Sequence, residues 1–270
     1  MVNPQRQGRL VTHPTSNPTE ETLDSPAESK DHLRFVLVHG SWHDGRCWDQ
    51  TATLLESSGH EVHSLTLPGN GTLSDPSVTM EQTAAAVVDL IRNNDLHDVV
   101  IVGHSFGGAV VQLAALQVPD RLRRIVFYNA YVLENGASIF SYVPPSVGGA
   151  LAGAANADGT MALPYGFWRD HLINDADTAT AQAAYEFLCP EPLARSSQPV
   201  DLTGFDELPV PRSYLYAYED NVYPAAEFTW HPGMSQRLGD FRLVVVPGGH
   251  ELMFSAPSVL AEGLVASARD

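Results

Sequence analysis

Short apolar runs recur from Leu33 to the end of the chain, and most of them are rich in valine, isoleucine and leucine. Runs of this length, bounded by turn residues, are typical of strands that a parallel sheet buries on both faces. The pattern predicts strands in the segments RFVLVHG (34–40), EVHSLTLPG (61–69), DVVIVG (98–103), IVFYN (125–129), RSYLYAYED (212–220) and RLVVVPGGH (242–250).

Longer segments between these runs carry the apolar spacing of helices that cover a sheet. Gly59 ends the first of them, Thr79 is placed to cap the second, and Pro119 closes the third. Strands that alternate with helices of this length indicate an α/β protein with a doubly wound, mostly parallel sheet. The predicted helices are CWDQTATLLESSGH (47–60), TMEQTAAAVVDLIRNND (79–95), GGAVVQLAALQV (107–118) and APSVLAEGLVASAR (256–269).

The alternation stops between about Asn135 and Gln198, where aromatic residues, small residues and prolines are mixed with helical stretches. An insertion of this length inside a compact fold is usually a functional element such as a lid. We therefore expect a core formed by residues 33–134 and 199–270, into which a largely helical lid or cap at 135–198 is inserted.

Residues 1–32 have a different composition, rich in proline, threonine, serine, glutamate and asparagine and poor in large apolar residues. Such a segment cannot bury enough surface to offset the entropy lost when the chain becomes ordered. We expect it to be a flexible arm or to drape over the surface of the folded core.

The charge balance excludes two classes of partner. The chain has 270 residues, of which 32 are acidic and 15 basic, for a net charge of −17. Nucleic acids and anionic membranes bind positively charged surfaces, so we expect neither as a partner. An acidic surface that keeps the protein soluble is sufficient to explain the charge. The sequence leaves a homodimer open.

Cysteine content and hydropathy bear on the cellular compartment. Cys47 and Cys189 are too few for a disulfide framework or a zinc cluster, and we expect both to be free thiols. No apolar run approaches the roughly 20 residues of a transmembrane helix, and the first residues lack a basic region followed by an apolar one. The expected location is therefore the cytoplasm.

The segment IVGHSFGGAV (101–110) places Ser105 between Gly103 and Gly107. This spacing matches a nucleophile elbow, in which a strand turns sharply into a helix and presents a serine hydroxyl above the sheet. So short a pattern also arises by chance. Here, however, a buried strand precedes it and an apolar helix follows, which is the context that the motif requires.

A serine hydroxyl needs a neighbouring imidazole to take its proton, and a carboxylate to orient that imidazole. His250 follows the last predicted strand in a glycine-rich loop, so it is the predicted base. His231 is the alternative, but it lies in an irregular stretch and is expected to be structural. His104 precedes the serine and is expected to be a satisfied polar residue of the core.

Two carboxylates, Glu219 and Asp220, follow the preceding predicted strand, and only one of them can orient the imidazole. Neighbouring residues at a strand end face opposite ways, so the pattern alone leaves both open. The strand before that ends at Asn129, which could orient a ring but could not stabilise its charge.

The oxyanion of an acyl-transfer reaction needs hydrogen-bond donors already in place. One is expected to be the backbone amide of Phe106, directly after the serine at a helix N-terminus. The other is expected from the loop after the first strand, where Gly40 allows a close approach and the amide of Ser41 points inward. An ordinary strand–helix loop is the alternative.

Over residues 33–268 the chain resembles the α/β-hydrolase fold superfamily. Within it, the chain looks like the branch that holds plant methylesterases of the salicylate-binding type and hydroxynitrile lyases. In that branch the acid lies a few residues before a proline, so the resemblance favours Asp220, ahead of Pro224. The segments that carry it are FVLVHGSWHDGRCW (35–48), LLESSGHEVHSLTLPGNG (54–71), VGHSFGG (102–108), YEDNVYP (218–224) and PGGHELM (247–253).

The same resemblance separates esterase from lyase. The lyases carry a threonine after the first strand's histidine and a lysine after the catalytic histidine, and here these positions hold Gly40 and Glu251. No ammonium group is thus placed to hold a leaving cyanide. Trp42 fills a loop position that is often small in the methylesterases and narrows or reshapes the pocket mouth. His43 matches a recurrent histidine of this loop, with substrate contact and a structural role both open.

These residues predict a serine esterase that attacks an ester carbonyl through Ser105, with His250 as base and Asp220 as its partner, and that uses neither a metal nor an organic cofactor. The lid is expected to supply an apolar pocket, which suits a small aromatic or alkyl ester or a lactone. Each candidate wall could equally be lid core. The candidates are Phe140, Tyr142, Met161, Leu163, Phe167, Trp168 and Phe187.

Other functions share these residues. The fold also hosts carbon–carbon hydrolases, lyases and cofactor-free oxygenases, and fold alone does not decide among them. A small-molecule receptor could keep the pocket, although it has no need of a complete triad and oxyanion loop. A biosynthetic enzyme that cyclises or dehydrates its substrate with an adapted triad is the third alternative.

Overall fold

The predicted strands form one six-stranded sheet in the order β2-β1-β3-β4-β7-β8, and every neighbouring pair is parallel. The structure is a computed structural model, and it describes residues 32–144, 149, 153, 155–223 and 229–269. The strands are β1 (Arg34–Val38), β2 (Glu61–Ser64), β3 (Val99–His104), β4 (Leu122–Tyr128), β7 (Arg212–Ala217) and β8 (Arg242–Val246).

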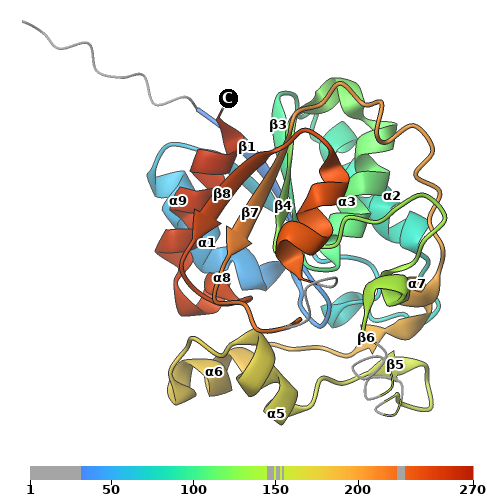
Figure 1. Ribbon diagram of the computed structural model, residues 1–270, viewed down its shortest axis with the longest axis vertical. Coiled ribbons are helices and arrows are strands. Elements are labelled where there is room, and N and C mark those ends of the chain that lie inside the picture. Colours follow the sequence, from blue (N-terminus) through green and yellow to red (C-terminus); the bar gives the residue numbers. More distant parts are fainter. Residues whose placement is uncertain (1–31, 145–148, 150–152, 154, 224–228, 270) are drawn as a thin grey trace, which may run out of the picture. The chain divides into compact units, whose positions relative to one another are not determined.

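Helices cover both faces of this sheet (Figure 1). α1 (Asp49–Ser57) and α9 (Pro257–Ala268) pack on one face, and α2 (Met80–Asn93) and α3 (Gly107–Gln117) pack on the other. Each layer contributes to its own buried apolar cluster, because successive side chains of a strand point to opposite faces of the sheet. The doubly wound α/β architecture is therefore confirmed.

Local sequence explains where these elements begin and end. All six residues of β3 are buried, as its unbroken apolar run predicted for a central strand. Thr79 caps α2 through a capping box, because its hydroxyl accepts from the Gln82 amide while the Gln82 side chain accepts from the Thr79 amide. Gly59 takes a φ of +88° after α1, a conformation that favours glycine.

The inserted segment contains short elements, and its two-stranded antiparallel sheet was not predicted. Its longest α-helix among the described residues has eight residues, so the pattern of a long amphipathic helix does not develop. In Figure 1 these elements lie beyond the ends of the parallel strands at which the arrowheads point. They are β5 (Thr160–Met161), α5 (Tyr165–Phe167), α6 (Thr178–Tyr185), β6 (Glu191–Pro192) and α7 (Leu193–Ser197).

Shorter helical turns complete the described elements. α8 (Leu252–Ser255) precedes α9. The 3₁₀ turns are Gly45–Trp48, Gly71–Leu73, Pro119–Arg121, Ile139–Tyr142 and Ser235–Leu238, and the π turns are Trp168–Leu172 and Trp230–Met234.

Three further expectations concern the N-terminal arm, membrane-spanning helices and the cysteines. Residues 32–270 form one compact unit, whereas the expected N-terminal arm lies outside the described residues except for His32. Among the helices of the described residues, none combines the length and the apolar character needed to cross a membrane. Cys47 and Cys189 are free thiols in the structure.

Candidate active site

The carboxyl ends of the parallel strands meet at one edge of the sheet, and this edge gathers the predicted site residues. Register pairs Val38 with Gly103, His104 with Tyr128, and Ala217 with Val246. The residues that follow each strand therefore emerge side by side, although they are far apart in the sequence. Ligands of open α/β sheets bind at this edge.

Ser105 lies in the sharp turn between β3 and α3, with a φ of +51°. A non-glycine residue in this conformation is strained, and such strain is typical of the elbow. The flanking glycines allow the turn: a Cβ on Gly103 would lie 2.5 Å from the Gly107 carbonyl oxygen, and one on Gly107 would lie 2.7 Å from that of Val38. Any side chain at either position would force α3 away from the sheet.

His250 follows β8 and contacts the predicted acid. Its Nδ1 donates a hydrogen bond of 2.5 Å to Oδ2 of Asp220, and both side chains are almost fully buried. The indole of Trp230 stacks on the imidazole with ring centroids 5.3 Å apart. Ser105 and His250 both line one cavity, so the structure brings the predicted nucleophile and base to the same space.

The two candidate carboxylates differ in position. Glu219 is exposed, whereas the Asp220 side chain is buried against His250. The amide nitrogen of Asn129 donates to Oδ2 of Asp220 at 2.6 Å, and the Val222 amide donates to Oδ1 at 2.9 Å. Asn129 thus orients the acid, while the sequence analysis considered it as a group that could orient the ring.

The main chain of His250 is also held in place. Its carbonyl oxygen accepts hydrogen bonds from the Tyr128 hydroxyl at 2.7 Å and from Nε2 of His104 at 3.1 Å. Burial alone would lower the pKa of His250, but the charge of Asp220 and the hydrogen bond to it raise that pKa above its usual value of 6.5. The imidazolium is therefore stabilised where a base must hold a proton.

The other two histidines that the sequence analysis considered, His231 and His104, differ in how many of their ring nitrogens have hydrogen-bond partners. His231 bonds to Ser235 at 2.7 Å and is not among the residues that line the cavity. His104 is buried, and burial holds its pKa well below the usual value, so it is neutral. Its Nε2 donates to His250, but its Nδ1 has no partner among the described residues. The expectation of a fully satisfied core residue was therefore wrong at one atom.

The loop after β1 approaches the elbow closely. A Cβ on Gly40 would lie 3.0 Å from Cβ of Ser105 and from Nδ1 of His104. The Gly40 carbonyl accepts from Nδ1 of His39 at 2.8 Å, and Nε2 of His39 accepts from the Leu67 amide at 3.0 Å. Burial lowers the pKa of His39 to about 3, so this bridging ring stays neutral.

The two expected oxyanion donors lie near this approach. Of the two residues, Ser41 lines the cavity, and Phe106 follows the lining residue Ser105 in the chain, at the start of α3. Among the described residues, neither backbone amide donates a hydrogen bond to another protein group. Backbone amides without a protein partner can donate to a ligand oxygen.

The cavity wall contains part of the predicted set. Trp42, Phe140, Met161 and Phe167 line it, whereas Gly40, His43, Tyr142, Leu163, Trp168 and Phe187 do not. Trp168 is fully buried and donates from its indole to the Ala181 carbonyl, and Tyr142 packs under the guanidinium of Arg237. Phe187 is 43 % exposed. Trp168 and Tyr142 are thus buried outside the cavity wall, as the core alternative expected, whereas Phe187 fits neither the wall nor the core.

Several wall residues were missed by the sequence analysis. Tyr131 and Tyr223 share a hydrogen bond between their hydroxyls and line the cavity with Trp230. Their only sequence signal is an aromatic residue shortly after a predicted strand. Glu191 was also missed, although its carboxylate lines the cavity from the segment 135–198.

His43 and Glu251 form a buried pair behind the wall. Nε2 of His43 lies 3.5 Å from a carboxylate oxygen of Glu251, and both side chains are about 1 % exposed. Burial raises the pKa of Glu251. Ligand atoms of His104, His250 and Glu251 lie within 4.8 Å of one another. We assign no metal to them.

Comparison with known proteins shows which family this chain resembles. A family model described as the alpha/beta hydrolase family matches residues 35–262. A carbendazim hydrolyzing esterase of Nocardioides sp. is 30 % identical over 244 residues, which cover 86 % of this chain and 98 % of that protein. Methylesterase 2 of Arabidopsis thaliana is 27 % identical over 263 residues, or 90 % of this chain and 98 % of that one.

A solved structure agrees with these relatives. An extracellular alpha/beta-hydrolase from a Paenibacillus species, described as sharing structural and functional homology with tobacco salicylic acid binding protein 2, superposes with a TM-score of 0.85. It is 38 % identical, and the match covers 88 % of this chain and all of that one. The parallel sheet, the elbow and the matched relatives lead to one conclusion: the chain belongs to the alpha/beta hydrolase family.

Proposed function

We propose that the protein is a serine hydrolase of the carboxylesterase type that cleaves a small apolar or aromatic ester or lactone through an acyl-enzyme on Ser105. One observation carries the proposal: His250, which is bonded to Asp220, and the elbow serine line the same cavity, and the backbone amides of Ser41 and Phe106 have no partner among the described residues. A binding protein would need none of these groups in this arrangement.

In the proposed reaction the Ser105 oxygen attacks the ester carbonyl carbon, and His250 takes the hydroxyl proton at Nε2. Asp220 keeps the Nδ1 proton in place and stabilises the imidazolium that forms. The imidazolium then donates its proton to the leaving alkoxide, which departs as the alcohol. Water repeats the sequence on the acyl-enzyme and releases the carboxylic acid.

The negative charge that develops on the carbonyl oxygen is stabilised by hydrogen bonds that the backbone amides of Ser41 and Phe106 donate to it. In acyl-transfer enzymes, the loss of one such donor costs about 2.7 to 4 kcal/mol of transition-state stabilisation. The α3 N-terminus adds the positive end of its dipole beside Phe106.

The substrate class follows from the cavity wall and from the relatives. The wall is mostly aromatic and aliphatic, with Phe140, Phe167 and Tyr223 among its members, which favours an apolar acyl or alcohol group. Relatives described as a carbendazim hydrolyzing esterase and a methylesterase support an ester of a small molecule. Residues 135–198 are proposed as the lid that supplies much of this wall.

A panel of p-nitrophenyl and methyl aryl esters tests the proposal. We expect turnover of at least one ester by the wild-type protein and a loss of about 10⁵-fold or more in kcat for His250→Gln. The matched control is His231→Gln, which changes the rival histidine outside the cavity and is expected to keep its rate within threefold. Refusal of every ester while Ser105 remains reactive would favour a lyase or a cyclising enzyme instead.

Location and assembly remain predictions. The Paenibacillus relative is described as extracellular, so it gives no support to the cytoplasmic location that the sequence suggested. Fractionation of the source cells decides the location, and light scattering of the purified protein decides whether it is the homodimer that the sequence leaves open.

A further inference from the structure

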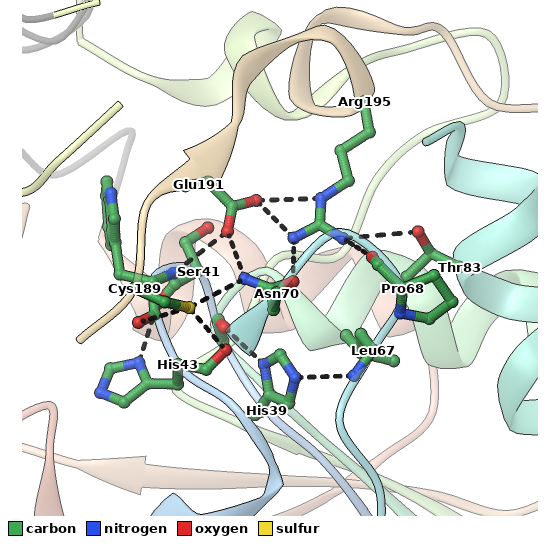
Figure 2. Close-up of polar contacts among 12 residues, drawn as sticks. His39, Ser41, His43, Leu67, Pro68, Asn70, Thr83, Cys189, Glu191 and Arg195 are labelled. Atoms are coloured by element: carbon green, nitrogen blue, oxygen red, sulfur yellow. Dashed lines mark hydrogen bonds and ion pairs between the residues drawn. The ribbon is translucent and has the colours of Figure 1, made fainter. Parts of the chain in front are cut away.

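A fully buried ion pair lies within the proposed lid, and one of its members, Glu191, lines the cavity (Figure 2). Arg195 of α7 donates from Nε and Nη2 to one carboxylate oxygen of Glu191 in β6, at 3.0 and 2.8 Å. The side chains are 0 % and 2 % exposed. A pair at this depth pays a large desolvation cost, so its geometry has to be well satisfied.

The second oxygen of Glu191 reaches the loop that carries Ser41. It accepts hydrogen bonds of 3.1 Å from the Trp42 backbone amide and from the side-chain amide of Asn70. Because Trp42 directly follows Ser41, this contact fixes the peptide unit next to the first proposed oxyanion donor.

The lid holds Trp42 at two further atoms. Its carbonyl accepts from the Cys189 amide at 2.7 Å, and its indole donates to the Met161 carbonyl at 3.2 Å. Trp42 has a φ of +64°, a left-handed conformation that costs a non-glycine residue roughly 1–2 kcal/mol. These contacts hold the loop in a strained shape that it would not favour alone.

Arg195 contacts the side chain of Phe106, the residue that carries the second proposed donor. Its guanidinium carbon lies 4.5 Å from the ring centroid of Phe106, the residue whose amide follows the nucleophile. The same guanidinium donates to the Pro68 carbonyl at 2.8 Å and to Oδ1 of Asn70. The planar group is thus fixed at three points while it packs on the ring.

We propose that Glu191 and Arg195 are positioning residues for the oxyanion hole: one buried ion pair of the lid holds the Trp42 amide beside Ser41 and packs on Phe106. The inference rests on the proposed function, because it assigns a role within that reaction. It makes the lid part of the machinery that binds the transition state, in addition to a wall for the substrate.

The alternative is that the pair only stabilises the lid. The two roles can be separated, because replacing a buried ion pair with apolar side chains of similar volume is often neutral for stability. We therefore choose the double substitution Glu191→Met with Arg195→Met, which removes both charges and leaves neither partner unpaired. Glu191→Gln is the conservative variant and can keep one acceptor for the Trp42 amide.

With p-nitrophenyl butyrate as substrate, the double variant is expected to lose about 10- to 100-fold in kcat per active site, with KM within threefold of the wild type. The loss is smaller than deletion of a donor, which costs about 10²- to 10³-fold. Affinity for an aryl trifluoromethyl ketone, whose serine adduct carries an oxyanion, should fall in parallel. Affinity for the matching aryl methyl ether should not change. For Glu191→Gln, kcat and the affinity for the ketone should lie between those of the wild type and those of the double variant.

Arg212→Met is the matched control. Arg212 is also buried, donates to the Leu238 and Phe205 carbonyls at 3.0 and 2.6 Å, and packs on the Phe205 ring, away from the cavity. We expect it to lower Tm and to leave kcat per active site unchanged. The proposal is overturned if the double variant, or Glu191→Gln should the former not fold, keeps kcat and ketone affinity within twofold of the wild type.

One readout is independent of catalysis. Loss of the Glu191 acceptor should speed hydrogen exchange of the Trp42 amide by about tenfold or more in the double variant, and not in Arg212→Met. An unchanged Trp42 amide refutes the positioning role even if no ester is turned over. Failure of the proposed function has a different signature, namely a wild-type protein that refuses every ester while the Trp42 amide responds as expected.

Discussion

Two of the buried pairs, His250–Asp220 and Arg195–Glu191, each contribute one residue to the wall of the cavity, and they differ in their chemistry. In the first pair, the charge of Asp220 and the hydrogen bond to it raise the pKa of the His250 imidazole above its usual value. In the second, the planar guanidinium of Arg195 binds the Glu191 carboxylate in a fixed geometry. An imidazole can move a proton, whereas a guanidinium–carboxylate pair of this kind serves to hold geometry.

The two pairs also differ in where they come from. Asp220 and His250 follow neighbouring parallel strands, so the sheet itself brings them together. Glu191 and Arg195 belong to the lid, four residues apart, and reach the site through hydrogen bonds to a loop. The comparison suggests that the sheet supplies the reacting groups and that the lid supplies their alignment.

The largest effect expected on the sheet side comes from Asp220→Asn. The substitution keeps the shape but removes the charge and favours the wrong imidazole tautomer, so kcat should fall by about 10⁴-fold. Steady-state kinetics with the best ester of the panel measures it. A loss below tenfold would contradict the assignment of Asp220 as the partner of His250.

The pH dependence of kcat/KM also distinguishes the His250–Asp220 pair from the Glu191–Arg195 pair. Only neutral His250 can accept the serine proton, and its pKa is raised, so kcat/KM should rise with pH to a midpoint above 6.5. Asp220→Asn removes the raising charge and leaves the lowering effect of burial, so the midpoint should move to lower pH. The lid substitutions Glu191→Met with Arg195→Met should leave the wild-type midpoint where it is.

Asn129→Ala is the sheet-side counterpart of the lid variants, because Asn129 positions Asp220 as Glu191 positions the Trp42 amide. It removes the 2.6 Å hydrogen bond to Oδ2 of Asp220. We expect a loss of about tenfold in kcat, in line with the 10- to 100-fold loss on removing supporting polar groups at other sites. Unlike the lid variants, it should also shift the pH midpoint; an unshifted midpoint would argue against this role.

The smallest effect is expected for Asn70→Ala. Asn70 donates to Glu191 and accepts from Arg195, so its loss loosens the ion pair without removing either charge. A three- to tenfold loss in kcat with unchanged KM is expected, on the scale of about 1 kcal/mol for one hydrogen bond. A rise in KM alone would show that the network serves substrate binding rather than alignment.

The order of strands and the elbow could be predicted because both follow from local pattern. An unbroken apolar run marked β3, and glycines at positions 103 and 107 marked the turn that only they permit. The placement of His250 and Asp220 near one another then followed from parallel strand ends. Pattern alone left Glu219 and Asp220 open, and burial of one of them distinguishes the two.

The lid could not be predicted to the same depth, for two physical reasons. Glu191 and Arg195 have the i,i+4 spacing of an ordinary exposed helix pair, and nothing in the sequence shows that tertiary contacts bury them. Aromatic residues in a short insertion serve equally well as wall or core, which is why Phe167 lines the cavity while Trp168, its neighbour, is buried in the lid.

The central claim is that Ser105 forms the acyl-enzyme, and covalent labelling tests it most directly. The wild-type protein and Ser105→Ala are incubated with a fluorophosphonate, digested, and analysed by peptide mass spectrometry. We predict one label per wild-type chain, on the peptide that contains Ser105, and no label on Ser105→Ala. A wild-type protein that hydrolyses esters yet carries the label on another residue, or carries none, would contradict the account.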